Sequence, residues 1–217
     1  MALKDLLLED KKILEQLAVK INEHFFGGEL PEIIINTEPT KKALGHFWAK
    51  RWKHGENEYS EINISPIFFD RGPLSVVNTL HHEMVHLFNN IHDIKDTSGK
   101  RHNKKFHQAC LDHGLFSDKI PGPIGYTTFD DREKQLPEWL EWFDQTVIDL
   151  DLNNHFQHAY VPVMKIKKPR INTSFICDET GQRFYLPDKL AKAYYDGELD
   201  SLTSPYVSGG TVTPADE

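Results

Sequence analysis

The chain of 217 residues has little cysteine, no long apolar run and no excess of positive charge. Its two cysteines, Cys110 and Cys177, are too few for a disulfide framework and suit a reducing compartment. No segment approaches the roughly 20 apolar residues of a membrane-spanning helix, and the first residues lack the apolar core of a signal peptide. We therefore expect a soluble, cytoplasmic protein with no membrane partner.

The charge balance excludes a chain that binds nucleic acid through its overall charge. There are 25 basic and 33 acidic residues, which gives a formal net charge of −8. The apolar share of 39% is sufficient for a buried core, and no segment repeats at a fixed period. We expect one domain with an appendage.

The most informative segment is the pentapeptide at residues 82–86, which has the pattern H-E-x-x-H. On a helix, residues four apart lie on one face, so the imidazoles of His82 and His86 converge. Imidazole nitrogen suits Zn²⁺, and Glu83 between them is placed to take a proton from a metal-bound water. The pattern therefore predicts a hydrolase, most often one that cleaves peptide bonds.

The flanking sequence favours a metal site over an ordinary amphipathic helix with solvent-facing histidines. Apolar residues repeat at spacings of three and four: Val77, Leu80, Met84, Leu87 and Ile91. His82 and His86 lie nearly opposite Met84, so the helix packs on one side and presents its ligands on the other. His81 is rotated by about 100° from His82, and we expect it at the surface or beside the site.

A catalytic zinc usually has three protein ligands and one open position, so a third ligand is needed. His92 is one candidate, because its spacing from the motif resembles the metzincin pattern with Asn89 in place of a glycine. That pattern also needs a downstream methionine in a tight turn, and Met164 lies in a strand-like run instead. The other candidate is His102, in the first turn of an expected helix at 101–113.

Periodicity and turn residues predict an α+β fold with helices on one small sheet. The expected helices are 4–26, 73–91, 101–113, 137–149 and 187–196. The expected strands are 32–36, 43–52, 59–65, 159–166 and 173–177, with a hairpin turn at 179–181. We expect a core at 1–116, an appendage at 117–200 and a disordered tail at 201–217.

Several segments, taken in order, resemble one known family. They are Phe25–Pro31, Leu44–Phe47, Glu61–Pro66, His82–His86 and His102–Phe106. Over residues 5–116 this order is similar to the SprT-like, or Spartan-type, zinc metalloprotease domain, with Asn103 where the family has a glycine. The resemblance implies a zincin-like fold in which His82, His86 and His102 bind zinc and Glu83 is the general base.

The C-terminal part resembles the zinc ribbon that many SprT-like proteins carry, but without its ligands. The ribbon's first knuckle has the pattern C-x-x-C-G, whereas here Cys177 is followed by Thr180 at the second cysteine position. No further cysteine follows, so four zinc ligands cannot be assembled there. We expect a ribbon-like appendage that has no zinc.

The resemblance also implies a protein substrate that is associated with DNA or crosslinked to it. Basic residues beside aromatic ones are typical of surfaces that contact single-stranded or damaged DNA. The candidate contacts are Lys50, Arg51, Trp52, Lys53, Lys104 and Lys105. The alternative for these residues is an ordinary solvated strand face.

The hypothesis from the sequence is a zinc-dependent metallopeptidase of the SprT-like type. Two alternatives stay open. One is a nucleic-acid-binding module without activity, in which the zinc is structural and has four protein ligands. The other is a metzincin-type peptidase with His92 as its third ligand.

Overall fold

The computed structural model describes residues 3–122, 125–156, 172–197 and 212–214. The chain divides into an N-terminal unit, Met1–Val161, and a C-terminal unit, Pro162–Glu217. The helices of the N-terminal unit are α1 (Leu3–Phe25), η1 (Pro66–Arg71), α2 (Pro73–Ile91), α3 (Lys104–Asp112), η2 (Arg132–Lys134), α4 (Pro137–Asp149) and η3 (Leu152–Asn154). Its strands are β1 (Ile33–Asn36), β2 (Gly45–His54), β3 (Asn57–Ile64), β4 (Thr97–Ser98), β5 (Arg101–His102), β6 (Ser117–Lys119) and β7 (Tyr126–Thr128).

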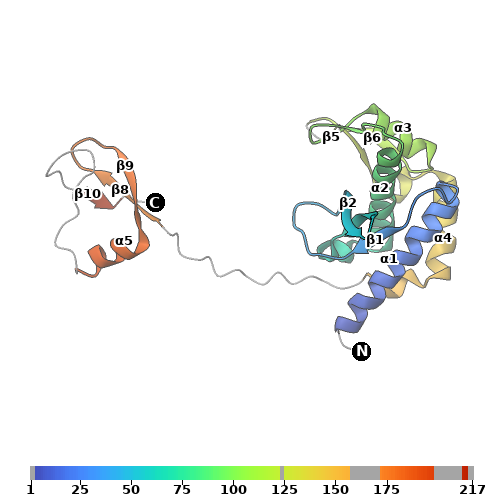
Figure 1. Cartoon of the computed structure of the whole chain (residues 1–217), viewed down its shortest axis with the longest axis horizontal. Helices are drawn as coiled ribbons and strands as arrows, with labels where there is room; N and C mark the ends of the chain where they lie inside the picture. Colours follow the sequence, from blue (N-terminus) through green and yellow to red (C-terminus); the bar gives the residue numbers. More distant parts are fainter. Residues whose placement is uncertain (1–2, 123–124, 157–171, 198–211, 215–217) are drawn as a thin grey trace. The chain divides into compact units, whose positions relative to one another are not determined.

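Helix α2 lies at the centre of the N-terminal unit, between α1 and the sheet (Figure 1). It begins at Pro73, where the missing N–H of proline costs nothing, and it ends at Ile91 as the sequence predicted. Its apolar stripe packs against α1 through fully buried side chains such as Leu17 and Leu80. The stripe therefore fixes α2 in the core and leaves its opposite face for the site.

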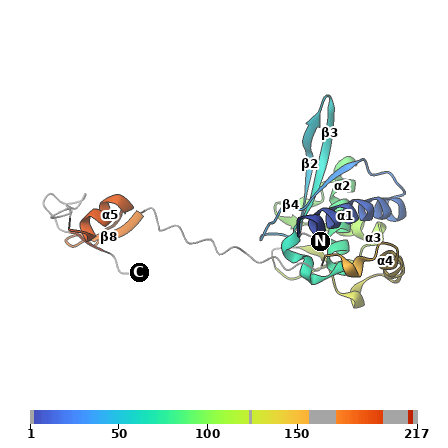
Figure 2. The ribbon, with the colours of Figure 1, turned by 90° about the horizontal axis from the view of Figure 1, so that it is seen from below.

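The main sheet has the strand order β1-β3-β2, with β3 parallel to β1 and antiparallel to β2. Ile62 and Ile64 of β3 are buried in the core, and the polar residues Glu61 and Asn63 of the same strand are buried as well. The hairpin of β2 and β3 extends beyond the helices (Figure 2). Its pairing shifts register between Trp48 and Trp52, and Lys50 within the shift has a positive φ of 50°.

Helix α4 belongs to the N-terminal unit, although the sequence suggested a core that ends at residue 116. Trp139 and Phe143 of α4 are buried in the same hydrophobic core as α1 and α2. The hydrophobic core of the N-terminal unit therefore continues beyond residue 116. The pattern of α4 itself was predicted with the same bounds, from Pro137 to Asp149.

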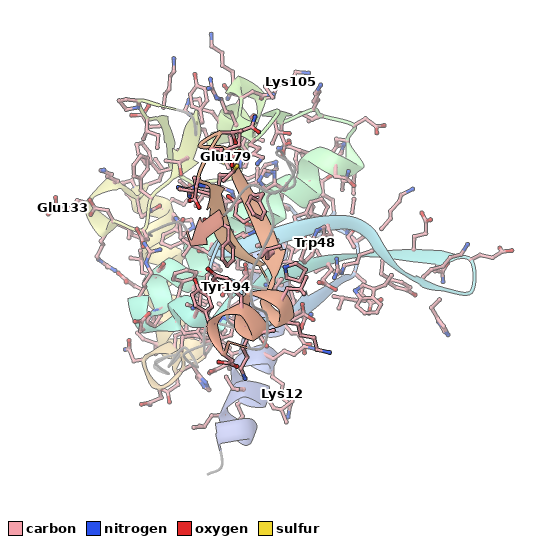
Figure 3. The ribbon with its side chains drawn as sticks, turned by 90° about the vertical axis from the view of Figure 1, so that its left-hand side faces the viewer. Lys12, Trp48, Lys105, Glu133, Glu179 and Tyr194 are labelled. Carbon is pink, nitrogen blue, oxygen red and sulfur yellow. The ribbon has the colours of Figure 1, made fainter. Side chains whose placement is uncertain are left out.

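The C-terminal unit is a three-stranded sheet with one helix. It contains β8 (Asn172–Cys177), β9 (Arg183–Pro187), α5 (Asp188–Tyr195) and β10 (Val212–Pro214), with the strand order β10-β8-β9. Gly181 has a φ of 67°, which suits the predicted hairpin turn. Phe175 packs on Ala191 and on Tyr194, which Figure 3 labels on the α5 helix.

The tail expected to be disordered from 201 to 217 forms strand β10 at Val212–Pro214, because these residues pair with β8. The strand expected at 159–166 lies outside the described residues. Within the part of the chain that the structure describes, none of the helices combines the length and apolar character needed to cross a bilayer.

Candidate metal centre and active-site cleft

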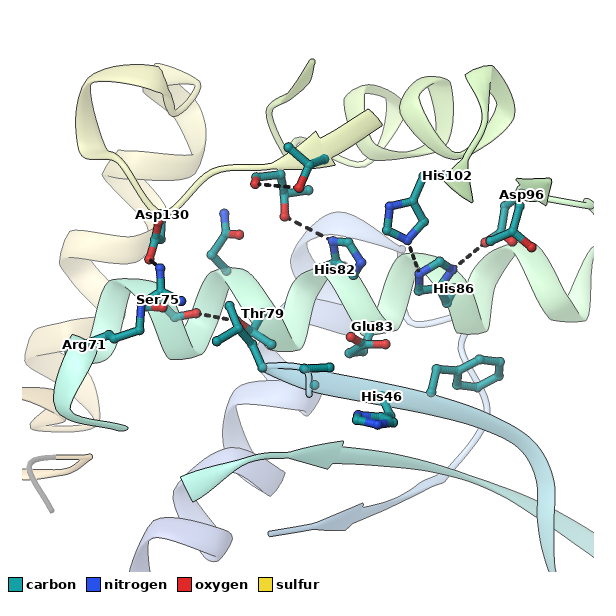
Figure 4. Close-up of a pocket in the computed structure, with 18 residues that line it drawn as sticks. His46, Arg71, Ser75, Thr79, His82, Glu83, His86, Asp96, His102 and Asp130 are labelled. Atoms are coloured by element: carbon teal, nitrogen blue, oxygen red, sulfur yellow. Dashed lines mark hydrogen bonds and ion pairs between the residues drawn. The ribbon is translucent and has the colours of Figure 1, made fainter. Parts of the chain in front are cut away.

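Three histidines converge above α2 (Figure 4). One ligand atom from each of His82, His86 and His102 lies within 4.8 Å of the other two. The ring centroids are 4.9 to 5.1 Å apart in all three pairs. The buried ring of Phe106 contacts all three imidazoles, at centroid distances of 4.1 to 4.8 Å, and forms an apolar wall behind them.

The Nδ1 atom of each of these rings contacts a protein oxygen. The distances from Nδ1 to oxygen are 3.1 Å for His82 and the Thr128 hydroxyl, 2.6 Å for His86 and the Asp96 carboxylate, and 2.9 Å for His102 and the Tyr126 carbonyl. A carbonyl or a carboxylate only accepts hydrogen bonds, so Nδ1 of His86 and of His102 carries the proton. In the neutral rings the lone pair is then on Nε2.

The Nε2 atoms of His86 and His102 are 3.1 Å apart. Two lone pairs at this distance repel unless a cation lies between them. Nitrogens bound to zinc at about 2.0–2.1 Å in a tetrahedron are separated by about 3.3–3.4 Å, close to the observed value. This pair of nitrogens is therefore close enough to bind one metal ion, and a ligand atom of His82 lies within 4.8 Å of both rings' ligand atoms.

His102 reaches the site from strand β5, and not from the first turn of a helix as the sequence suggested. The helix begins one turn later, because Asn103 is the N-cap of α3 and its side chain accepts from the N–H of Lys105 and Phe106. A side chain at position 125 would lie 2.4 Å from the His102 carbonyl, and Gly125 has a φ of 83°. The close approach of Gly125 thus holds β5 against the segment that precedes β7.

Glu83 lies on α2 beside the histidines and faces strand β2. Its side chain is buried, and its carboxylate accepts a hydrogen bond from the backbone N–H of Phe47. Burial raises the pKa of the Glu83 carboxyl to about 7, although the nearby His86 and the Phe47 N–H favour its charged form. A cation bound by the histidines would favour that ionised form further.

The three histidines differ in their affinity for protons. Burial lowers the pKa of His82 and of His102, and the proximity of His86 lowers both further. Burial also acts to lower the pKa of His86, but the hydrogen bond to Asp96 and the charge of Glu83 outweigh it and raise this pKa. His82 and His102 are therefore held in the neutral form that binds metal.

The histidines line a cleft of about 780 Å³ that runs along α2. One wall is β2 with the residues before it, and the other includes Thr127 and Thr128 of β7. The far end is closed by an ion pair between Arg71 and Asp130 (Figure 4). Because β2 is an edge strand, one of its backbone edges borders this cleft.

Two further histidines, His92 and His81, lie outside the group of three. His92 lies outside the group: its ring contacts Phe88, and its Nε2 is 3.7 Å from a carboxylate oxygen of Glu29. The helix does not end at Asn89, which is buried within α2. The surface position, one of the two expected for His81, was wrong. Its side chain is fully buried, and its Nδ1 accepts a hydrogen bond from Trp139.

The candidate nucleic-acid residues fall on two surfaces, and much of the charge on the first is paired. On the hairpin, the Lys50 ammonium lies 3.0 Å from Glu58, and Arg51 Nε lies 3.3 Å from buried Glu61. The indole N–H of Trp52 also donates to Glu61. Lys53 lies opposite Glu58 in the strand register, but the ion pair of Glu58 is with Lys50.

The second surface is the start of α3, where Lys104 and Lys105 are exposed shortly after the third histidine in the chain. Figure 3 labels Lys105. Neither lysine forms an ion pair with an acidic side chain in the described part of the chain. The structure does not bring the hairpin residues and these two lysines into one cluster.

Sequence reasoning missed two residues that shape the site. Asp96 binds His86, and Gly45 leaves the space that the Glu83 carboxylate fills. Asp96 lies in the loop between the motif and the third histidine. Its acidic side chain is only a weak signal there, because the loop contains several charged residues. Gly45 lies in the segment Leu44–Phe47 that resembles the family, but its contact with Glu83 could not be inferred, because that contact joins two elements far apart in the chain.

The comparison with family models agrees with this geometry. A family model described as the SprT-like family matches residues 14–120. The matched stretch runs from α1 to β6 and contains Glu83 and all three converging histidines. A comparison with curated proteins finds no significant match.

Proposed function

Because residues 14–120 match the model of the SprT-like family and contain three converging histidines, we propose that the protein is a zinc-dependent metallopeptidase. His82, His86 and His102 would hold the ion through Nε2 and leave its fourth position open. The observation that carries the proposal is that a buried carboxylate, Glu83, lies beside the three histidines in a cleft bordered by an edge strand.

The roles of the chain's own groups follow from this arrangement. A bound zinc ion supplies a Lewis acid that activates water and polarises the scissile carbonyl. Glu83 would accept the proton of the attacking water on its carboxylate and return it to the leaving nitrogen. The free edge of β2 offers backbone groups that an extended substrate chain can pair with. Phe106 excludes water from the rear of the histidines.

The direct test replaces the proposed base. Glu83→Gln keeps the size of the side chain but cannot take a proton, so cleavage of an unfolded protein substrate should fall by at least about 100-fold. Zinc content should stay at the wild-type level. Glu56→Gln, at an exposed position of the hairpin turn, is the matched control and should retain activity. Activity of the Glu83 variant at the wild-type rate would remove Glu83 from the mechanism.

We propose further that the substrates are proteins associated with DNA or crosslinked to it. The support is the family resemblance together with the exposed Lys104 and Lys105 beside the site. The basic residues of the hairpin support it less, because Lys50 and Arg51 have acidic partners. Lysines at a surface contact phosphates without reading sequence, so single-stranded DNA of any sequence should serve.

This second proposal has its own experiment. Cleavage of a basic DNA-binding protein is measured with and without single-stranded DNA, with Glu83→Gln as the inactive control. DNA should accelerate the wild type, and a Lys104→Ala/Lys105→Ala variant should lose most of that acceleration. Equal rates with and without DNA would leave a general peptidase.

The alternative of a structural zinc makes a different prediction about coordination. It requires four protein ligands, whereas the described residues supply one group, which has three. X-ray absorption of the zinc-loaded protein distinguishes a site with three nitrogens and a solvent oxygen from one filled by protein ligands.

A further inference from the structure

The three candidate ligands differ in the groups that hold their Nδ1 atoms. Thr128 offers a neutral hydroxyl to His82, and Tyr126 offers a backbone carbonyl to His102. Only His86 faces a carboxylate, that of Asp96, and its 2.6 Å contact is the shortest of the three. A charged acceptor forms a hydrogen bond about twice as strong as a neutral one.

Asp96 is itself held in place from two helices. The Asn89 side chain of α2 donates to the same carboxylate oxygen at 3.2 Å. The backbone N–H of Asn103, the N-cap of α3, donates to the Asp96 carbonyl at 2.9 Å, and the Asn103 side chain donates to the carbonyl of Lys95. Residue 96 therefore connects the helix that carries His86 to the helix that follows His102.

The surroundings of Asp96 offer it no other charged partner. Its side chain is 15% exposed, and among the described residues its ion pair within 4.0 Å is with His86 and with no lysine or arginine. A half-buried carboxylate without a cation is unfavourable unless it serves a bound group. The histidine proton directed at Asp96 provides that group.

We propose that Asp96 is a positioning residue for the metal centre, which it orients through His86. The carboxylate fixes the Nδ1–H tautomer of His86 and turns its Nε2 toward the other two rings, and Asn89 keeps the carboxylate in place. The inference rests on the proposed function only in that the three histidines bind zinc.

The test measures zinc affinity in full-length protein by competition with a chelator, so that it does not depend on catalysis. Asp96→Ala should weaken zinc binding by about 10–100-fold, as is usual when the outer partner of a ligating histidine is lost. Asp96→Asn keeps an acceptor oxygen without the charge and should fall between Asp96→Ala and the wild type. Asn89→Ala should weaken binding less than Asp96→Ala does.

Asp93→Asn is the matched control, because it removes one negative charge from the same loop at an exposed position. Asp93 has a φ of 54°, which asparagine tolerates. Its zinc affinity should equal that of the wild type. Thermal unfolding of each variant is measured without and with zinc. Loss of a structural residue lowers the unfolding temperature of the metal-free protein, whereas loss of a positioning residue lowers the stabilisation gained on adding zinc.

Two results would overturn the inference: wild-type affinity in Asp96→Ala, or an equal loss in Asp93→Asn. Neither would touch the proposed function, which fails if the wild-type protein does not bind zinc at its histidines. A variant that is too unstable to assay is replaced by Asp96→Asn, which preserves the size of the side chain.

Discussion

Gly45 of β2 and Glu83 of α2 lie so close that a methyl group at position 45 would be 2.9 Å from Glu83 Oε1. The same methyl group would be 2.9 Å from Cγ2 of Thr79. Glycine is needed here because of this approach and not for its backbone freedom. The edge of the sheet thus sets the position of the proposed general base.

Gly45→Ala should therefore displace the Glu83 carboxylate. We expect kcat to fall by roughly 10–100-fold with zinc affinity unchanged, because a shift of about 1 Å in a catalytic group has effects of this size. Peptidase assays together with zinc titration provide the measurement. Thr79→Ser removes only the Cγ2 methyl and should remain active; full activity of Gly45→Ala would show that the carboxylate has room to move.

The ligand set predicts opposite results for two histidines of the same region. His102→Ala should lower zinc affinity by more than about 100-fold, since losing a ligand costs more than losing its outer partner. His92→Ala should bind zinc normally, because its ring lies against Phe88 and Glu29. Zinc bound per chain after dialysis measures both, and the reverse pattern would favour the metzincin-type ligand set.

His81 should make the fold sensitive to acid. Burial lowers its pKa to about 3 from 6.5, with further lowering by His113 and His24. Between these pH values the unfolded chain binds one proton more than the folded chain does. The folded state is therefore not penalised by His81 above about pH 6.5, and it is destabilised progressively as the pH falls toward 3.

His81→Asn tests this dependence, because asparagine does not titrate yet offers an acceptor to the Trp139 indole N–H. The free energy of unfolding, measured with a chelator present, should decline less steeply with acid in the variant, by up to about 1.4 kcal/mol per pH unit. Parallel curves for the two proteins would place the acid sensitivity elsewhere.

The N-cap of α3 explains why asparagine replaces the glycine of the family pattern at position 103. Both residues are favoured at this position, so Asn103→Gly should cost only a few tenths of a kcal/mol from the cap itself, whereas Asn103→Ala should cost about 1 kcal/mol. Denaturant unfolding of both variants measures the difference. Equal losses would mean that the bond to the Lys95 carbonyl, which both variants lack, dominates.

Helices α2 and α4 were predictable because their signals are local. The stripe of α2 and the prolines that begin α2 and α4 gave the bounds that the structure has. Burial of His81 was not predictable, because Phe25 and Trp139, which cover its ring, come from distant segments. A helical wheel assigns a residue to a face but does not show which elements will pack against that face.

The candidate site was likewise predictable only in part. The motif predicted the convergence of His82 and His86, whereas the placement of His102 needed the family pattern. Its position in β5 depends on the Gly125 approach, and Asp96 depends on two helix ends, so both follow from tertiary packing. Contacts between segments with no shared periodicity leave no trace in a single sequence.

The register shift in β2 limits what the cleft can recognise. Pairing with β3 is regular from Gly45 to Trp48 and again from Trp52 to His54, and the register shifts between these stretches, where Lys50 has a positive φ. A target docked along this edge would gain main-chain bonds over a few residues only. The proposed peptidase would therefore select targets that are locally unfolded and held close to the cleft, and it would depend little on the amino-acid sequence of the target.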